Sequence, residues 1–427
     1  MHERARFWTV SSPRILRALG AMSVALVVVL AACSPDTPEA RIGETMQRVE
    51  DIRGLDSDRD VPYSFLASDV AFVDLLEELD DQEMVSELEA EASLFSRLGL
   101  MEADVDRVEL AKESTKRSIL GFYDPEAKHM TIVDEDGEVS PDELMVLAHE
   151  HAHALQDQHY DLETRLETLD DDAHLALKAL IEGEATIVMY VWAIKRLSFL
   201  DWTEIEERED IEVPTDYEPL RSVPPILWRP GEFPYVDGAA FVYEFWEPGG
   251  WDAVHDMWAD PPASTEQVMH PSRYPDDVPV AVGLPDVAAT LGAGWSTDME
   301  LTMGELQTSV LLADGDDWDY GEDEDVVFPF PQAANAKAAE GWGGDRLQML
   351  QGPEDAWAIV WQTTWDSEAD ALEFAGAANV VMADLEGRPV ASLGIDITAD
   401  RLAHPVLVIV ADSDPTYQTV AAALELG

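Results

Sequence analysis

The chain has 427 residues, enough for two or more domains, and its 46% hydrophobic and 8% aromatic content excludes a disordered protein. Its 88 acidic residues against 26 basic ones give a formal net charge of −62. This charge excludes nucleic acid and anionic lipid as electrostatic partners, because binding either needs a basic patch. We interpret the excess as a halophilic adaptation, in which salt screens the acidic surface, with steering of cationic substrates as the alternative.

Residues 1–32 are predicted to be a lipoprotein signal peptide. Two arginines precede an apolar run at residues 18–32 that is short for a membrane span. The run ends in Leu30-Ala31-Ala32-Cys33, which resembles the bacterial lipobox, in which the cysteine becomes the acylated first residue. Cys33 is the only cysteine, so no intramolecular disulfide can form. We expect Cys33 to anchor an extracytoplasmic protein to a bacterial cell membrane through a polar tether at residues 33–53, the alternative being an incidental cysteine after a plain signal peptide.

The main domain is predicted at residues 54–300 and begins with elements that serve packing. The patterns predict a strand at 61–66, helices at 70–79 and 84–98, and a hairpin of strands 119–124 and 129–134 around the turn 125–128. The second hairpin strand, His129–Asp134, lies just before the helix described next. We therefore expect it to pair with an extended peptide substrate by strand addition.

A helix with metal-binding spacing follows this hairpin. Ser140 and Glu143 form a capping box around Pro141, which predicts a helix start at that point. The helix carries His149-Glu150-x-x-His153, so both imidazoles lie on one face, one turn apart, and can share a metal with Glu150 beside them. His151 points away from this face and is interpreted as a supporting residue.

Two histidines leave a third ligand to be found. His159 has the metzincin spacing from His153, but that pattern requires glycine where this chain has Gln156, to turn the chain back towards the metal. The other candidate is Glu182, in a predicted helix at residues 172–197. Two other acids remain open as ligands, Glu184 and Asp157, the latter also as an acceptor for an imidazole N–H.

The chain resembles a known family at two segments. Glu182-Gly183-Glu184-Ala185 is similar to the Glu-Gly-x-Ala ligand segment of aminopeptidase N-like gluzincins, with residues 161–172 as an insertion. The segment 235–241 is similar to their Tyr-x-Lys-Gly segment, with Asp237 at the lysine position. Further segments resemble uncharacterised bacterial His-Glu-x-x-His lipoproteins: 121–126, 154–159, 182–186, 249–251 and 264–268.

This resemblance implies a mostly helical gluzincin-like fold with a small β-hairpin or sheet, and one catalytic Zn²⁺ on His149, His153 and Glu182. Such a zinc activates a water and polarises the scissile carbonyl. Glu150 is the expected general base, and Tyr235 the donor to the oxyanion, with His270 as a second candidate.

The predicted function is a membrane-anchored, zinc-dependent peptidase acting on a peptide or protein substrate. The alternative is a binding or envelope-maintenance lipoprotein that keeps the zinc fold without cleaving. Glu150 favours the enzyme, because only turnover requires it. His174, His255 and His404 are interpreted as structural.

Residues 301–340 are predicted to be an acidic linker and 341–427 a small α+β domain. Eight of the twelve residues 314–325 are acidic, without the order of an EF-hand loop. Strands are predicted at 346–350, 357–361 and 404–410, with helices at 367–383 and 415–426. The overall fold class predicted is therefore α+β with a predominance of helix.

Overall fold

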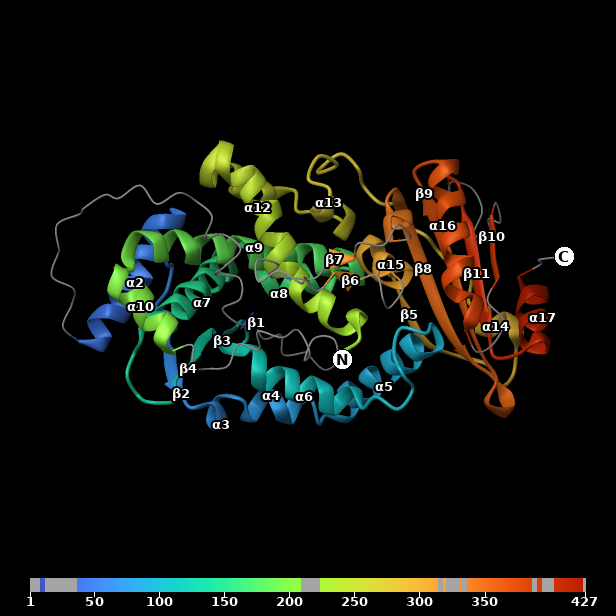
Figure 1. Cartoon of the computed structure of the whole chain (residues 1–427), viewed down its shortest axis with the longest axis horizontal. Helices are drawn as coiled ribbons and strands as arrows, with labels where there is room; N and C mark the ends of the chain where they lie inside the picture. The colour runs from blue at the N-terminus through green and yellow to red at the C-terminus, as the bar shows by residue number, and fades with distance from the viewer. Residues whose placement is uncertain are drawn as a thin grey trace.

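The computed structural model describes residues 8–11, 37–208, 223–313, 318–319, 330–331, 336–385, 390–393 and 403–424 (Figure 1). A helical part with a small sheet occupies one end of the elongated molecule, and a five-stranded sheet with helices occupies the other. The fold is a mixed α+β fold in which helix predominates, as the sequence predicts.

The helical part is built around three long helices. The largest buried cluster joins α7 (Pro141–Tyr160), α9 (Asp171–Arg196) and α12 (Pro225–Ala259) with α2 (Pro38–Arg53). Its shorter helices are α3 (Ser68–Ala71), α4 (Val73–Glu78), α5 (Gln82–Arg97), α6 (Arg107–Ser118), α8 (Leu162–Glu167), α10 (Phe199–Arg208) and α13 (Thr265–Met269).

A four-stranded sheet lies against α7. Its order is β1-β3-β4-β2, from the strands β1 (Trp8–Ser11), β3 (Ile119–Asp124), β4 (His129–Val133) and β2 (Tyr63–Leu66). The predicted hairpin is confirmed as the antiparallel pair β3–β4. The capping box of Ser140 and Glu143 is also confirmed, and α7 begins where it predicts.

Two predictions about this part are wrong. Strand β4 is an inner strand with β3 on one side and β2 on the other, so its backbone has no free edge for a peptide substrate. Residues 38–53 are not a tether, because they form α2, which buries Ile42 and Val49 in the helical core. The buried residues of this polar segment recur every three to four positions, so they lie on one face of the helix and pack against the core.

The predicted signal peptide is described only at β1, which pairs with the edge of β3. Its apolar run and Cys33 lie outside the described residues. Within the described ranges, no helix combines the length and apolar character needed to cross a membrane.

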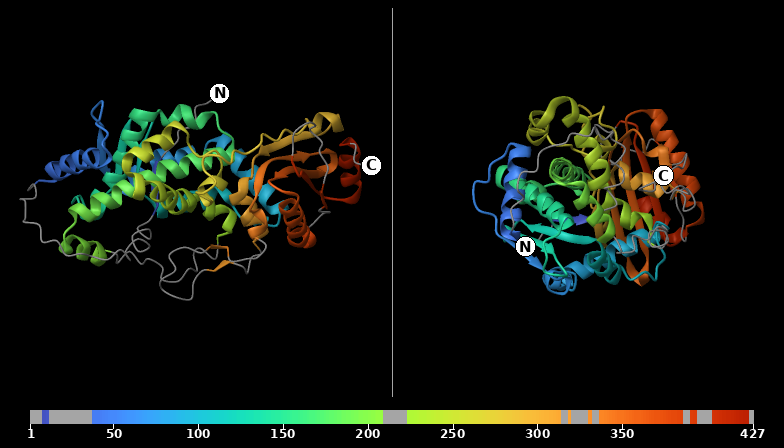
Figure 2. Two further views of the ribbon diagram at one scale, coloured as in Figure 1. Left: turned by 90° about the horizontal axis from the view of Figure 1, so that it is seen from above. Right: turned by 60° about the vertical axis from the view of Figure 1, so that its left-hand side comes forward.

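The second part is an antiparallel sheet of order β10-β11-β9-β8-β5 with helices on both faces (Figure 2). The strands are β5 (Ser296–Leu301), β8 (Trp342–Gln351), β9 (Trp357–Trp365), β10 (Val390–Leu393) and β11 (Val406–Ala411). Along β11, alternate residues enter different clusters, so α16 (Glu368–Val381) covers one face and α17 (Asp414–Ala423) with α14 (Val287–Leu291) the other.

The predicted boundary and linker between the two parts are corrected. Strand β5 pairs with β8, so the second part already includes residues that were assigned to the main domain. Helix α15 (Gly304–Leu312) is buried between the two parts, with Leu306 in one core and Val310 in the other. Of the acidic segment 314–325, only β6 (Trp318–Asp319) is described, and it pairs with β7 (Phe330–Pro331). The described part also contains three 3₁₀ turns: η1 (Ala336–Ala339), η2 (Pro353–Asp355) and η3 (Met382–Asp384).

Helices α9 and α12 approach each other closely at two glycines. A Cβ atom added to Gly183 would lie 2.2 Å from the carbonyl oxygen of Gly238, and one added to Gly238 would lie 2.3 Å from the carbonyl oxygen of Ala179. Since both obstacles are backbone atoms, no side-chain rotation relieves the clash. Gly183 and Gly238, which lie in the two segments that resemble gluzincins, are thus required for the close crossing of α9 and α12.

We expect Gly183→Ala to lower the free energy of unfolding by about 2 kcal/mol, because the helices must move apart. Gly231→Ala is the matched control on α12, since nothing lies within 4 Å of its added Cβ. Alanine at this position reduces the conformational entropy of the unfolded chain, so the free energy of unfolding should rise by about 0.5–1 kcal/mol. Denaturant titration of both variants measures the difference, and equal effects would contradict the role of the crossing.

Candidate metal centre

Helix α7 carries a row of buried polar side chains through the core. His149, Glu150, His151 and His153 are each at most 1% exposed, as is Gln156. Burying polar groups costs free energy unless they find partners. The partners of these side chains therefore identify what the helix does.

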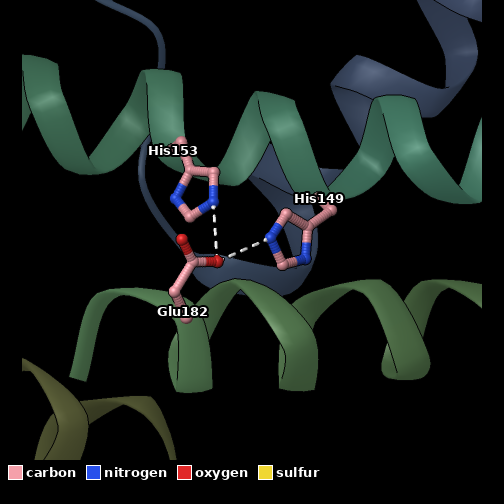
Figure 3. Close-up of side chains that lie close together, drawn as sticks. All are labelled: His149, His153 and Glu182. Carbon is pink, nitrogen blue, oxygen red and sulfur yellow. Dashed lines mark hydrogen bonds and ion pairs between the residues drawn. The ribbon is translucent and has the colours of Figure 1, made fainter. Parts of the chain in front are cut away.

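His149 and His153 meet Glu182 across the interface between α7 and α9 (Figure 3). The Oε2 atom of Glu182 lies 3.1 Å from Nε2 of His149 and 3.3 Å from Nε2 of His153. One ligand atom from each residue lies within 4.8 Å of the others. The structure thus brings together the three residues that the sequence predicts as metal ligands.

The surroundings place His149 and Glu182 in the protonation states that a metal requires. Burial lowers the pKa of His149 to about 4, so its imidazole is neutral at pH 7. Burial opposes ionisation of Glu182, but His153 and His149 outweigh it and hold the pKa of this carboxyl at about 2. Neutral imidazoles and an ionised carboxylate are the forms that coordinate metals.

Glu150 lies next to this group without being part of it. Its side chain is fully buried, and neither carboxylate oxygen has a hydrogen-bond partner among the described residues. Burial, together with the charge of Glu182, raises its pKa well above the ordinary value. A buried carboxylate with open acceptor sites costs free energy, and a cation or water at the group would satisfy it.

Gln156 links the two helices at the site, a role that the sequence did not predict. Its Oε1 atom lies 2.9 Å from Nδ1 of His153, and its Nε2 donates to the backbone carbonyl of Ile181 at 2.9 Å. A hydrogen bond from Nδ1–H selects the tautomer in which Nε2 is free to face Glu182. The residue that excluded the metzincin pattern is therefore the one that orients the second histidine.

Tyr235 reaches the same site from α12. Its ring stacks on that of His149, with centroids 6.2 Å apart, and its side chain is buried. The crossing at Gly183 and Gly238 brings this turn of α12 to α9. Asp237, at the position of the family's lysine, instead pairs with Arg229 at 2.8 Å.

The structure separates the remaining ligand alternatives from the site. His151 faces α2, with Nε2 3.4 Å from a carboxylate oxygen of Glu50, as expected for a supporting residue. His159 is exposed at the end of α7, and its Nε2 lies 2.9 Å from the carbonyl oxygen of Asp56. Asp157 accepts from Tyr123 at 2.7 Å and does not orient an imidazole.

Glu184 faces away from the metal group. Arg53 of α2, only 3% exposed, donates to its carboxylate, and the indole of Trp258 donates to it as well. Arg53 also donates to the hydroxyl of Tyr160 at 3.0 Å, which lies 3.1 Å from Nδ1 of His255. This fully paired network fastens α2 to α9, and removing one partner of such a buried pair typically costs about 3–5 kcal/mol.

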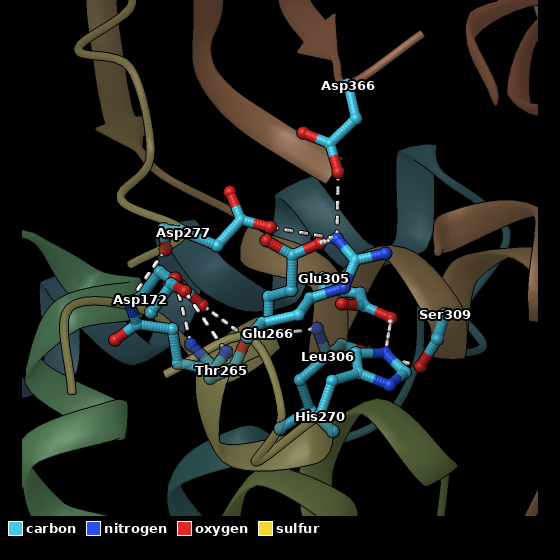
Figure 4. A network of polar contacts seen from close by, with 12 residues as sticks. Asp172, Thr265, Glu266, His270, Asp277, Glu305, Leu306, Ser309 and Asp366 are labelled. Atoms are coloured by element: carbon cyan, nitrogen blue, oxygen red, sulfur yellow. Dashed lines mark hydrogen bonds and ion pairs between the residues drawn. The ribbon is translucent and has the colours of Figure 1, made fainter. Parts of the chain in front are cut away.

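His270 occupies a different setting from the predicted one. Its Nε2 lies 2.8 Å from Glu305 of α15, in a polar network between the two parts of the molecule (Figure 4). Thr265, five residues before His270, binds Asp172 in the first turn of α9. Glu182 lies ten residues further along α9, about 15 Å away along the helix axis. The position of His270 beside Glu305 therefore contradicts its predicted role as an oxyanion donor.

Two other acidic groups have other partners. Arg273 lies among Glu266, Asp277 and Asp366, so these carboxylates neutralise a guanidinium. Asp134 accepts from the backbone amides of Asp136 and Gly137, and Glu143 belongs to the capping box. Neither group combines acids with histidines.

Comparison with known proteins gives one match. A family model described as a domain of unknown function, DUF8575, matches residues 290–422, from the end of α14 to α17. No curated protein and no solved structure matches the chain. The match covers the second part of the molecule and leaves His149, His153 and Glu182 outside it.

Proposed function

We propose that the protein is a zinc-dependent peptidase with its centre at His149, His153 and Glu182. The observation that carries this proposal is the fully buried group of two imidazoles and one carboxylate beside Glu150, a carboxylate with no hydrogen-bond partner in the described part of the chain. A metal-binding residue set alone would serve a structural site. Hydrolysis also requires a general base, and Glu150 beside the group can serve as one.

The spacing of the ligand atoms suits zinc. Zinc binds imidazole nitrogen and carboxylate oxygen at about 2.0–2.1 Å in tetrahedral geometry, which separates neighbouring ligand atoms by about 3.3 Å. The separations of 3.1 and 3.3 Å between Glu182 and the two imidazoles agree with this value. Three protein ligands are also the set that leaves one position for water or substrate.

The chain's own residues then divide the work of hydrolysis. Bound zinc would supply a Lewis acid for the scissile carbonyl. Glu150 takes the proton of the attacking water and returns it to the leaving amine, and its raised pKa favours holding that proton between the two steps. Tyr235, stacked on His149, donates its phenolic hydrogen to the oxyanion, while Gln156 holds His153 in the required tautomer.

We further propose that Cys33 is acylated and holds the protein on the outer side of a cell membrane. The first described residue after Cys33 is Thr37, which caps α2. Since α2 belongs to the core, only three residues, 34–36, separate Cys33 from the folded body. The body would then lie close to the lipid surface.

The metal site predicts one tightly bound zinc per chain. His149→Ala and Glu182→Ala should each abolish stoichiometric binding, because each removes one of three ligands. His159→Ala is the control, since His159 lies on the same helix outside the group. Competition with a chromophoric chelator measures the affinities, and loss of zinc in the His159 variant alone would show that the third ligand is wrong.

Gln156→Leu should weaken zinc binding by about 10–100-fold, because His153 loses the acceptor for Nδ1–H. Gln156→Glu should recover most of this affinity, since it keeps an acceptor for the imidazole. Gln158→Leu is the matched control two residues along α7, where the side chain accepts from the backbone of Asp58 at 2.8 Å. Equal affinities in the two leucine variants would exclude the orienting role.

Glu150→Gln should keep zinc and lose at least about 10²-fold in turnover, because the amide cannot accept the proton of water. The assay is cleavage of a peptide library by the full chain in molar salt. If wild type and variant both bind one zinc and neither cleaves any peptide, the peptidase proposal fails. A zinc-containing binding or envelope-maintenance lipoprotein would then be the remaining interpretation.

A further inference from the structure

The corner between α9 and α10 exposes three large apolar side chains. Ile194 is 72% exposed, Phe199 83% and Leu200 76%. Ile194 lies in the last turn of α9, and the other two are the first residues of α10. We call Ile194, Phe199 and Leu200 the apolar corner. A group of exposed apolar side chains on a very acidic chain marks a site that a partner or a membrane can cover.

Two ion pairs show where this corner lies relative to α2. Near the end of α2, Arg53 binds Glu184 of α9, and near its beginning Glu44 binds Arg196 at 2.7 Å. The two helices are therefore antiparallel, and the turn of α2 that carries Glu44 lies beside the end of α9. The apolar corner lies on both sides of Arg196 in the chain, at the end of the molecule opposite the five-stranded sheet (Figure 1).

The predicted acylation site is close to the same place. Cys33 precedes Thr37, the cap of α2, by four residues, which span at most about 14 Å when fully extended. An acyl chain at Cys33 would hold this end of α2, and with it the apolar corner, near the lipid. The exposed Lys195 beside Ile194 can extend its ammonium group towards headgroups while its stem stays in apolar surroundings.

We propose that Ile194, Phe199 and Leu200 insert into the lipid surface and form a second membrane contact beside the acyl chain. Diacyl or triacyl anchoring at Cys33 would already hold the protein on the membrane, and the apolar corner adds a second point of attachment. It also fixes the orientation of the body, because two separate points of attachment prevent free rotation about the tether. The proposal rests on acylation of Cys33 and is independent of peptidase activity.

The test uses the full chain in vesicles of phosphatidylcholine and phosphatidylglycerol in molar salt. Cys33 is the only natural cysteine, so Phe199→Cys adds one site for an environment-sensitive fluorophore once Cys33 is acylated. Val380→Cys is the matched control, an apolar residue 67% exposed on α16. We expect the label at position 199 to be quenched by lipid-borne quenchers and shielded from iodide, and the label at position 380 to behave in the opposite way.

A label at position 199 that iodide reaches as readily as the label at 380 overturns the proposal. Shielding that is already present without vesicles also overturns it, in favour of coverage by a second copy or by the chain itself. Phe199→Ser with Leu200→Ser should lower vesicle partition by roughly tenfold or more. The intact mass of the chain reports acylation separately, so lipid insertion without an acyl group would refute the anchor and keep the apolar corner.

Discussion

The crossing of α9 through the helical core is the constraint on which the rest of the structure depends. Glu182, Gly183 and Glu184 meet three different neighbours within three residues. The two glutamates are about 200° apart around the helix, so one faces the histidines of α7 and the other faces Arg53 of α2. The glycine between them allows α12 to touch the backbone, which brings Tyr235 to His149. One short segment thus sets the positions of α2, α7 and α12.

Burial makes this arrangement both costly and specific. Glu150, Glu182 and Glu184 are each at most 1% exposed, and only one of them is fully paired by protein groups. Glu184 has Arg53 and Trp258, which makes it a brace. Glu182 faces the imidazoles of His149 and His153, which hold it in the ionised form, whereas Glu150 has no hydrogen-bond donor among the described residues. The first carboxyl group can therefore bind a cation, and the second can hold a proton. Glu182 and Glu184 lie two positions apart in α9, and they differ because the two faces of the helix meet different partners.

The two parts of the molecule are joined by buried polar contacts as well as apolar ones. Thr265 connects Asp172 at the start of α9 with the amide of Leu306 in α15, and Asp345 of the second sheet accepts from the amides of Met303 and Gly304. Burial raises the pKa of Asp172 to about 8 and that of Asp345 to about 7. These buried contacts therefore connect α9, which carries Glu182, to the five-stranded sheet.

The sequence by itself determined the local features of this protein. The capping box, the two histidines one turn apart, the hairpin and the strand β11 depend on neighbours close in the chain, and the structure has them close to where they are predicted. Tertiary structure alone decided the partners: that Gln156 rather than Asp157 orients His153, that α2 is part of the core, that β4 has neighbours on both sides, and that His270 binds Glu305. These outcomes depend on which surfaces meet in space, and residue types and spacing along one segment do not carry that information.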